Sequence, residues 1–417
     1  MKIVIVGAGS SYTPELIQGL IEHYEALPFS HVCLMDVDEQ RLEILAGLSQ
    51  RMLSKAGLPV AVTSTTERRR ALEGAAFVNS LIRVGGMDAR INDERIPLKY
   101  GVVGQETTGP GGMMKALRTI PVVLGLAKDM VEVCPEAWLI NYTNPSGILA
   151  EALGKHSQVR FVGLCSGPKG WTDAICRLMG VDPTRANVDW IGLNHLGFAT
   201  RVWVDGRDAT ERAVEAVTDR WGIDSEWLRT LGLIPAGYLR YYYHHTEVVR
   251  EAQEPGHRTR GEQVKEIEAE LLRQYADPNL AEKPGLLAKR GGGGYSDVAF
   301  AAMRAIHHNT SERQIVQVLN QGAVDGIPDD GSVEVPCVVG RTGPHPIRMG
   351  AIPLPVRGLI QAVKAYESLT VQAAMEGSRR VAMQALMAHP LVPSWEVAKP
   401  MLDELLTVNR PWLRWAA

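Results

Sequence analysis

The chain has 417 residues, of which 45% are hydrophobic and 22% are charged, and its formal net charge is −3 at pH 7. This composition is typical of a globular protein, and the slightly negative charge provides no long-range attraction for nucleic acid or an anionic membrane. The length predicts two domains. Any anion that the protein binds is therefore expected to be held by local arginine, lysine or backbone groups.

The absence of a targeting pattern and the few cysteines predict a cytoplasmic protein. Met1 leads directly into the first predicted strand, and no apolar run is long enough to span a membrane. The five cysteines are odd in number and scattered, so we expect reduced thiols rather than a disulfide framework.

The first residues predict a dinucleotide-binding turn. Lys2–Val6 is a β-branched run typical of a buried parallel strand. Gly7 and Gly9 follow at a spacing that brings backbone N–H groups to a pyrophosphate at a helix start. A second predicted strand, His31–Met35, ends at Asp36, whose carboxylate can accept ribose hydroxyls and repel a 2′-phosphate. NAD is therefore favoured over NADP.

The same turn departs from the usual fingerprint at its third glycine. Ser10 and Ser11 are included in the predicted cofactor site, and Tyr12 occupies the position of the missing glycine. The alternative interpretation is an α/β domain with a tight first turn and no nucleotide.

Strand and helix patterns alternate over residues 1–195 and predict a Rossmann-like, doubly wound parallel sheet of the lactate/malate dehydrogenase type. Further strands are predicted at Phe77–Ile82, Ala137–Asn141 and Arg160–Leu164, with helices at Pro14–Ala26 and Lys115–Val133. Ligands of such sheets bind beyond the carboxyl ends of the strands.

The alternation stops near residue 195, so residues 196–417 are expected to form a mixed α+β domain for substrate binding and oligomerisation, packed over the ligand edge of the sheet. Helices are predicted at Glu211–Leu231, Glu262–Tyr275 and Val356–Ala388, and a β-ribbon at Val333–Pro355.

Cys165 and His195 each follow a glycine-containing apolar stretch and are expected at strand ends near the cofactor. A thiolate and an imidazole suit a catalytic transition-metal ion with open positions for substrate oxygens. Spacing alone leaves two alternatives open: two unrelated core residues, or a Cys–His nucleophile pair.

Three further segments are candidate ligand contacts. Gly104–Gly112 contains four glycines and a proline and is expected to be a loop across a ligand, the alternative being a flexible surface loop. Arg83 and Arg90 frame two glycines and suit an anion or sugar hydroxyls. Asn141–Pro145 places two carboxamides at a strand end, where they are either turn residues or ligand contacts.

The tyrosine-rich run Tyr238–His245 is typical of packing. A tyrosine becomes a general base only where a nearby cation lowers its pKa. Arg258, Arg260 and the glycine-rich stretch Lys289–Tyr295 add cations and backbone donors for an anion.

Together these segments resemble glycoside hydrolase family 4, the NAD- and metal-dependent glycosidases, and within it the 6-phospho-β-glucosidase branch. The resemblance covers nearly the whole chain, and the block at 93–112 is its most specific part. The matching segments are Gly-Ala-Gly-Ser-Ser-Tyr-Thr-Pro-Glu-Leu at 7–16, the arginines and glycines at 83–90, the block at 93–112, Asn-Tyr-Thr-Asn-Pro at 141–145, Gly-Leu-Cys at 163–165, Gly-Leu-Asn-His at 192–195, Tyr-Leu-Arg-Tyr at 238–241, Lys-Arg-Gly-Gly at 289–292 and Val-Glu-Val-Pro-Cys-Val-Val at 333–339.

The resemblance implies that Cys165 and His195 bind a divalent ion, typically manganese, and that Tyr238 is the catalytic base. It implies hydride transfer from C3 of the sugar to NAD⁺, deprotonation at C2, loss of the aglycone, water addition and return of the hydride. The net reaction would be hydrolysis of a 6-phospho-β-glucoside, with NAD regenerated. Members of such families are usually homodimers or homotetramers.

The resemblance also implies that Arg90, Asn144 and Arg260 contact substrate, although spacing leaves Arg258 as an alternative to Arg260. One position departs from the family pattern: Ser166 follows the metal cysteine where many members have Asn or Asp. Since α-specific members use Asp there as an acid, serine fits β-specificity but leaves the exact sugar open. The alternatives are an unphosphorylated or 6-carboxylate sugar, a net hydroxy-acid or sugar dehydrogenase, and a NAD-binding sensor without turnover.

Overall fold

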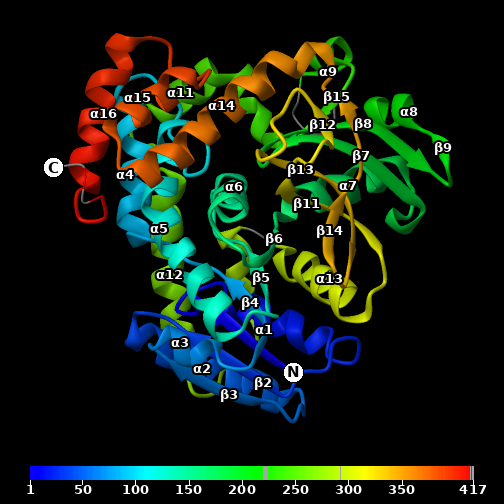
Figure 1. The fold of residues 1–417 in the computed structure, drawn as a ribbon, viewed down its shortest axis with the longest axis vertical. Helices are drawn as coiled ribbons and strands as arrows, with labels where there is room; N and C mark the ends of the chain where they lie inside the picture. Colours follow the sequence, from blue (N-terminus) through cyan, green and yellow to red (C-terminus); the bar gives the residue numbers. More distant parts are fainter. Residues whose placement is uncertain (219–223, 292, 414, 416–417) are drawn as a thin grey trace.

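A computed structural model describes residues 1–218, 224–291, 293–413 and 415. Its centre is a nine-stranded sheet in the order β14-β13-β11-β6-β5-β4-β1-β2-β3. In Figure 1 its N-terminal strands lie in blue at the bottom, and its last strands lie in yellow and orange on the right. The six parallel strands are β1 (Lys2–Val6), β2 (His31–Met35), β3 (Ala61–Thr65), β4 (Ala75–Ser80), β5 (Trp138–Asn141) and β6 (Arg160–Gly163).

These six strands have the order 3-2-1-4-5-6, so the predicted Rossmann-like sheet is confirmed. The order in which successive strands are added to the sheet reverses between β1 and β4. Sheets of this kind bind ligands at this switch point. Strand β4 ends at Ser80, two residues before the predicted end. Leu81 and Ile82 instead line the cavity described below.

Seven helices belong to the parallel part of the fold. They are α1 (Thr13–Glu22), α2 (Glu39–Lys55), α3 (Arg68–Leu72), α4 (Gly86–Lys99), α5 (Gly109–Val133), α6 (Ser146–His156) and α7 (Ser166–Met179). Because successive strands are parallel, these helices return the chain to the amino ends of the strands and cover the sheet.

The structure corrects the expected loop at Gly104–Gly112. Gly109–Gly112 forms the first turn of α5, with Pro110 near the helix start, where its fixed φ is compatible with a helix. The glycines permit close packing, because a Cβ on Gly111 would lie 2.5 Å from the carbonyl oxygen of Asp93. Only the part before α5 remains a loop.

The second half of the chain extends the same sheet. Gln317 pairs with Gly163 of β6 in the antiparallel sense, and two more antiparallel strands follow. The remaining strands are β7 (Ala186–Leu193), β8 (Leu196–Val204), β9 (Arg207–Asp208), β10 (Ile234–Pro235), β11 (Glu312–Leu319), β12 (Val324–Asp325), β13 (Ser332–Gly340), β14 (Gly343–Pro346) and β15 (Gly350–Ala351).

Consequently the expected division at residue 195 does not separate two sheets. His195 lies in the turn between β7 and β8, which pair directly as a hairpin, and strands from both sides of residue 195 share the central sheet. The hydrogen-bonded ladder between β6 and β11 joins the N-terminal and C-terminal parts into one continuous core.

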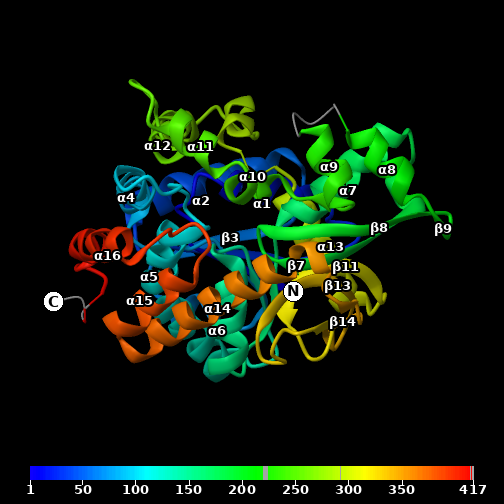
Figure 2. The same ribbon diagram turned by 90° about the horizontal axis from the view of Figure 1, so that it is seen from above.

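The described residues of the second half also form nine helices. They are α8 (Thr210–Val217), α9 (Ser225–Leu231), α10 (Arg240–Tyr243), α11 (His245–Ala252), α12 (Arg260–Tyr275), α13 (Tyr295–His308), α14 (Leu354–Glu376), α15 (Arg379–Ala388) and α16 (Trp395–Asn409). Figure 2 shows α10–α12 above the N-terminal sheet and α14–α16 on the side of α5. Short 3₁₀ segments lie at Pro183–Arg185, Gly237–Leu239 and Gly285–Arg290.

The helix predicted over Glu211–Leu231 corresponds to α8 and α9 rather than to one helix, and residues 219–223 of that prediction lie outside the described residues. The predicted helix Val356–Ala388 is likewise divided, because Gly377 ends α14 in the left-handed conformation. Across the described part of the chain, no helix combines the length and apolar character that crossing a membrane requires.

Candidate active site

The glycine turn after β1 has the geometry expected of a cofactor cradle. Gly7 adopts φ +85°, and a Cβ there would lie 2.8 Å from the backbone of Leu81. The N–H of Gly9 donates to Oδ2 of Asp36 at 2.7 Å, which joins the turn to the end of β2. Both glycines, Ser10 and Asp36 line one cavity of about 1090 Å³. A side chain at Gly7 would clash with the backbone that follows β4, and one at Gly9 would clash with the Asp36 carboxylate, so glycine keeps this turn compact at both positions.

Ser11 is placed differently from its neighbours. It is fully buried, its hydroxyl donates to Glu268 at 2.9 Å, and it does not line the cavity, so its side chain supports the turn from behind. Tyr12, at the position of the missing third glycine, donates to the carbonyl of Gly291 and lies 4.6 Å beneath the guanidinium of Arg290. The substitution of glycine by tyrosine therefore joins the turn to the segment after α12.

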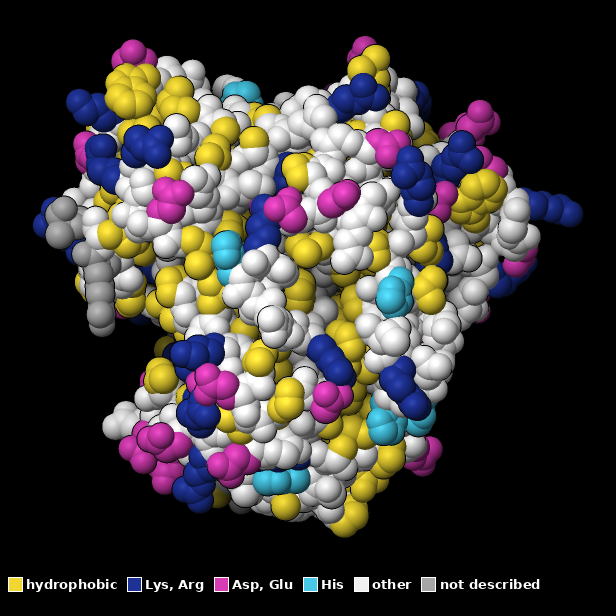
Figure 3. Space-filling view, in the orientation of Figure 1, with side chains coloured by type: hydrophobic (Ala, Val, Ile, Leu, Met, Phe, Trp, Pro, Cys, Tyr) yellow, Lys and Arg dark blue, Asp and Glu magenta, His cyan; other side chains and the backbone are white. Residues whose placement is uncertain are grey.

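The cavity extends from Asp36 to His195 and lies between the N-terminal part of the sheet and the helices above it. Figure 3 shows the surface indented between these two parts of the molecule. Asn144, Tyr238 and Arg260 also line the cavity, so the structure brings together most of the predicted site residues. The Asn144 side chain hydrogen-bonds to Tyr295, which holds it at the carboxyl edge of the sheet.

Three cations converge on one buried carboxylate inside the cavity. Glu106 accepts from Arg83 at 2.6 Å and Lys115 at 2.7 Å through Oε2, and from Arg90 at 3.0 Å through Oε1. Arg90 also pairs with Glu94 at 2.8 Å. Three cations and two carboxylates leave one positive charge in excess, which suits an anionic substrate group.

Burial controls the ionisation of this cluster. Burial opposes the charged form of Glu106, but Arg83, Lys115 and Arg90 outweigh it and hold its pKa well below the ordinary value. Burial, together with repulsion from Arg83, lowers the pKa of Lys115 to about 7, although Glu106 opposes this change. Lys115 therefore titrates near neutral pH, and a bound anion beside it would favour its charged form.

The two remaining arginines near the substrate end have different settings. Arg260 donates to the carbonyl of Lys289 at 2.9 Å and to Gln263 at 3.2 Å, and its side chain faces the cavity. Arg258 forms an ion pair with Glu266 on α12, lines the same cavity and also borders a hollow on the outer face. Both arginines therefore line the cavity, and they differ in that Arg258 is held by an ion pair to a carboxylate.

Cys165 and His195 lie where the sequence predicts, at the end of β6 and at the turn after β7. Both are buried, at 6% and 8% exposure. The Sγ of Cys165 accepts from the N–H of Gly167 at 3.4 Å, and burial with the charge of Glu334 raises the pKa of the thiol to about 12. A divalent cation would reverse this preference, since a coordinating thiol is deprotonated.

The tautomer of His195 follows from its hydrogen bonds. The hydroxyl of Thr107 donates its single proton to Gln105 at 2.8 Å, so its 2.7 Å contact with Nδ1 of His195 requires that Nδ1 be the donor. Nε2 then carries the lone pair. Burial lowers the pKa of His195 to about 4, so the imidazole is neutral, as a metal ligand must be.

A thiolate and a neutral imidazole fit a transition-metal ion such as Mn²⁺. In residues 1–218, 224–291, 293–413 and 415, no group of three or more His, Cys, Asp and Glu side chains could hold a metal ion. Two protein ligands leave the other positions for substrate and water, which is the arrangement of a catalytic rather than a structural site.

The ring of Tyr238 stacks on the imidazole of His195, with centroids 3.9 Å apart and an interplanar angle of 11°. Burial raises the pKa of this tyrosine, the neighbouring Cys165, Tyr241 and Glu106 raise it further, and Arg90 alone acts in the opposite direction. Within the protein alone, the neighbouring charges therefore do not lower the pKa of Tyr238. A cation at Cys165 and His195 is needed to favour the phenolate.

Several cavity residues escaped sequence analysis. Glu106 and Lys115 belong to the distinctive block at 93–112 or follow it closely, but neither stands out by spacing. Trp412, which follows α16, also lines the cavity and packs close to Gly85. The sequence carries no signal for this contact, because it joins residues more than 300 positions apart.

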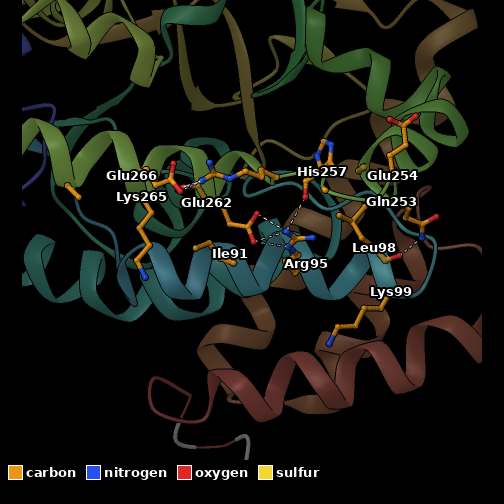
Figure 4. A pocket seen from close by; sticks show the side chains of 14 residues that line it. Ile91, Arg95, Leu98, Lys99, Gln253, Glu254, His257, Glu262, Lys265 and Glu266 are labelled. Carbon is orange, nitrogen blue, oxygen red and sulfur yellow. Dashed lines mark hydrogen bonds and ion pairs between the residues drawn. The ribbon is translucent and has the colours of Figure 1, made fainter.

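A second hollow, of about 1030 Å³, lies between α4 and α12 on the outer face (Figure 4). Arg95 donates to both oxygens of Glu262, at 2.8 and 2.7 Å, and Lys265 pairs with Asp88 at 2.5 Å. Because these charges are already paired, this hollow is a poorer site for a charged ligand than the main cavity.

The glycine turn, Asp36, His195 and Tyr238 all line one cavity that also contains several cations, and this combination places the protein among cofactor-dependent enzymes. The chain belongs to glycoside hydrolase family 4: residues 2–181 match the model for family 4 glycosyl hydrolases, and residues 190–392 match its C-terminal domain.

The chain is 44% identical to the "Probable 6-phospho-beta-glucosidase" of Bacillus subtilis, over 99% of this chain and 97% of that protein. It superposes with a TM-score of 0.93 on the 6-phospho-beta glucosidase of Thermotoga maritima solved with manganese, NAD⁺ and glucose-6-phosphate, at 34% identity and 99% coverage of both chains. A malate dehydrogenase of Plasmodium falciparum shares the fold, with a TM-score of 0.54 at 14% identity.

Metal removal tests the donor pair. A chelator should abolish activity and Mn²⁺ should restore it, and Cys165→Ser should weaken Mn²⁺ binding measured by calorimetry with little change in Tm, because serine keeps the shape but is a poorer ligand for such an ion. Cys176→Ser is the matched control, since Cys176 is equally buried on α7. Full activity of chelator-treated, metal-free enzyme would contradict the assignment.

Proposed function

We propose that this protein is a 6-phospho-β-glucosidase that uses NAD and a divalent metal ion, typically manganese. The observation that carries the proposal is one cavity that joins the Asp36 end of the sheet to His195 and Tyr238 and contains surplus positive charge. The relatives named above act on, or were solved with, a sugar that carries a 6-phosphate.

The dinucleotide would lie along the carboxyl edge of the sheet. Gly7, Gly9 and Ser10 border its pyrophosphate, and Asp36 accepts the hydroxyls of the adenosine ribose. Strands β2 and β6 are separated by four strand spacings, about 19 Å, enough for an extended dinucleotide to reach the catalytic end. When bound, NAD supplies reversible acceptance of a hydride, here from C3 of the sugar.

Cys165 and His195 would hold the divalent ion, which when bound supplies Lewis acidity toward the sugar oxygens. Thr107 fixes the tautomer and orientation of the imidazole, so that Nε2 is the ligating atom. The cavity opens beside this pair, and the sugar can approach it from the side of Asn144 and Tyr238.

Tyr238 is the proposed base that removes the C2 proton. Its ring stacks on His195 and the residue lines the cavity, and both observations support this role. Once C3 is oxidised, the C2 proton becomes acidic, because the resulting carbanion is conjugated with the ketone. Loss of the aglycone from C1, addition of water and return of the hydride complete a hydrolysis with no net redox change.

Replacing the phenol tests this role. Tyr238→Phe should lower kcat about 10²–10⁴-fold, as expected for a lost general base. Product formed by the wild-type enzyme in D₂O should carry deuterium at C2. Tyr241→Phe is the matched control, since Tyr241 lines the same cavity with its ring 6.1 Å from that of Tyr238. Full retention of the C2 proton would require a direct displacement instead.

Arg90, Asn144 and Arg260 are the proposed substrate contacts. Arg260→Met should raise KM about 10- to 100-fold, because it removes a charge-assisted hydrogen bond. Arg258→Met should change KM less than about twofold, since its guanidinium is already paired with Glu266. The two KM values, measured on the same 6-phosphorylated substrate, decide which arginine contacts it. The reverse order of effects would assign the contact to Arg258.

The 6-phosphate should dominate specificity. When the substrate lacks the 6-phosphate, the surplus cations of the cavity have no anionic partner. The kcat/KM for 4-nitrophenyl β-glucoside should therefore be more than about 10³-fold lower than for the same glucoside with a 6-phosphate. Comparable values for the two substrates, or preference for a 6-carboxylate, would identify a different sugar, and Ser166 after the metal cysteine would be the first residue to vary.

A net hydroxy-acid or sugar dehydrogenase is the second candidate, because the fold is shared with malate dehydrogenase. The donor pair Cys165 and His195 favours the hydrolase. Steady accumulation of NADH at 340 nm during turnover would favour the dehydrogenase, since a redox-neutral hydrolase produces none.

We also propose that the protein works in the cytoplasm as a homodimer or homotetramer. All five cysteines are buried and free, which suits a reducing compartment. Exposed apolar side chains on the C-terminal helices, among them Leu354, Met375, Met387 and Trp395, provide a surface for self-association.

A further inference from the structure

Glu334 is a buried carboxylate behind the metal donor pair. It lies on β13, is 1% exposed and is paired across the ladder with Gln317 of β11. Gln317 in turn is the residue of β11 that pairs with Gly163, two positions before Cys165. The C-terminal extension of the sheet thus brings Glu334 to the rear of the site.

All hydrogen-bond partners of Glu334 in the described residues are N–H donors. Its Oε1 accepts from Gln317 at 2.7 Å and from Asn194 at 3.1 Å, and its Oε2 accepts from the indole of Trp190 at 3.2 Å. No ion pair to Glu334 occurs among the residues that the structure describes. Amide and indole dipoles alone balance this acceptor, and burying such a group without a nearby cation is unfavourable.

These contacts connect Glu334 to both metal donors. Asn194 directly precedes His195 in the two-residue turn between β7 and β8, where His195 adopts φ +65°. The same Asn194 side chain hydrogen-bonds to Cys165. Glu334 therefore restrains the turn that carries His195. Through the Asn194 amide it also restrains the Cys165 thiol.

A third connection leads to the substrate end. The Oε1 of Gln317 accepts from the hydroxyl of Ser146 at 2.6 Å, and Ser146 lies two residues after Asn144. A Cβ on Gly163 would lie 2.8 Å from the same Gln317 oxygen, so the network is packed tightly against β6. Movement at Glu334 would be transmitted to the strand ends that form the site.

We propose that Glu334 is a positioning residue for the divalent ion, which fixes the donor-bearing segments through Asn194. The proposal rests on the metal site of the proposed function. Outer partners of metal ligands typically change metal affinity 10- to 100-fold when they are removed. Glu334 makes no contact with the cofactor turn, so its effect should be confined to the metal.

The test is Mn²⁺ binding to metal-free protein, measured by calorimetry for the wild type, Glu334→Gln and Asn194→Ala. Glu334→Gln keeps the shape of the side chain but replaces the carboxylate with an amide. The new NH₂ group would then face the N–H donors that the carboxylate accepts from. We expect the Kd for Mn²⁺ to rise 10- to 100-fold in each variant, while the Kd for NAD⁺ stays within twofold. In the double variant, the Kd for Mn²⁺ should rise by less than the product of the two single fold-changes, because both residues act through one network.

Glu151→Gln is the matched control. Glu151 is fully buried on α6 but pairs with Lys364 and Lys155 rather than with the donor segments, so its loss should lower Tm without changing the Kd for Mn²⁺. Wild-type Mn²⁺ affinity in folded Glu334→Gln and Asn194→Ala would overturn the proposal. If Glu334→Gln fails to fold, Asn194→Ala decides alone. If Cys165→Ser binds Mn²⁺ as the wild type does, the assignment of the metal site is wrong. This result distinguishes a failure of the proposed metal site from a failure of the role proposed for Glu334.

Discussion

The segment from Gln105 to Thr107 is the constraint on which the rest of the cavity depends. Glu106 keeps three closely spaced cations together that would otherwise repel one another, and it does so from a loop between α4 and α5. The next residue, Thr107, orients His195. Both functions require a fixed loop, and the side chain of Gln105 provides it by accepting from the N–H groups of Thr107 and Thr108 at 2.5 and 2.9 Å. Charge balance and metal-ligand geometry are therefore coupled through three consecutive residues.

The site is built for a cation that the side chains do not supply. Burial opposes the ionised forms of Cys165 and Tyr238, and the carboxylate of Glu106 reinforces this effect at Tyr238. Positive charge at the donor pair would favour both anions at once. In the proposed mechanism, metal binding and base activation would thus be one electrostatic event, because the Tyr238 ring is in contact with the His195 imidazole. Ordinary glycosidases instead rely on a pair of carboxylates.

The extension of the sheet explains how one chain combines a dinucleotide fold with sugar chemistry. In the parallel part, the strand ends can present only the residues that follow each strand. The antiparallel strands β11 and β13 add a second set of side chains behind β6, where Gln317 and Glu334 support the turn of His195. The two halves of the chain are therefore mutually dependent at the site, which neither half forms alone.

The sequence by itself determined the first α/β units and predicted a set of site residues, most of which line one cavity. The strand at Lys2–Val6, the glycine turn and Asp36 are local features, since strand burial and turn geometry depend on neighbouring residues, and their predicted bounds agree with the structure. The distinctive motifs predicted the family, because a specific order of rare segments is a property of the chain alone.

Only the tertiary structure decided which charged residues pair with one another, which tautomer His195 adopts and where the second half of the chain joins the first. Glu106 with its three cations, and Glu334 with Asn194 and Gln317, are contacts between segments far apart in the chain. The direction of the Tyr238 pKa shift also depends on burial, which no spacing pattern reports. Ionisation and long-range pairing are set by the three-dimensional distribution of charge and solvent, and this distribution exists only once the chain has folded.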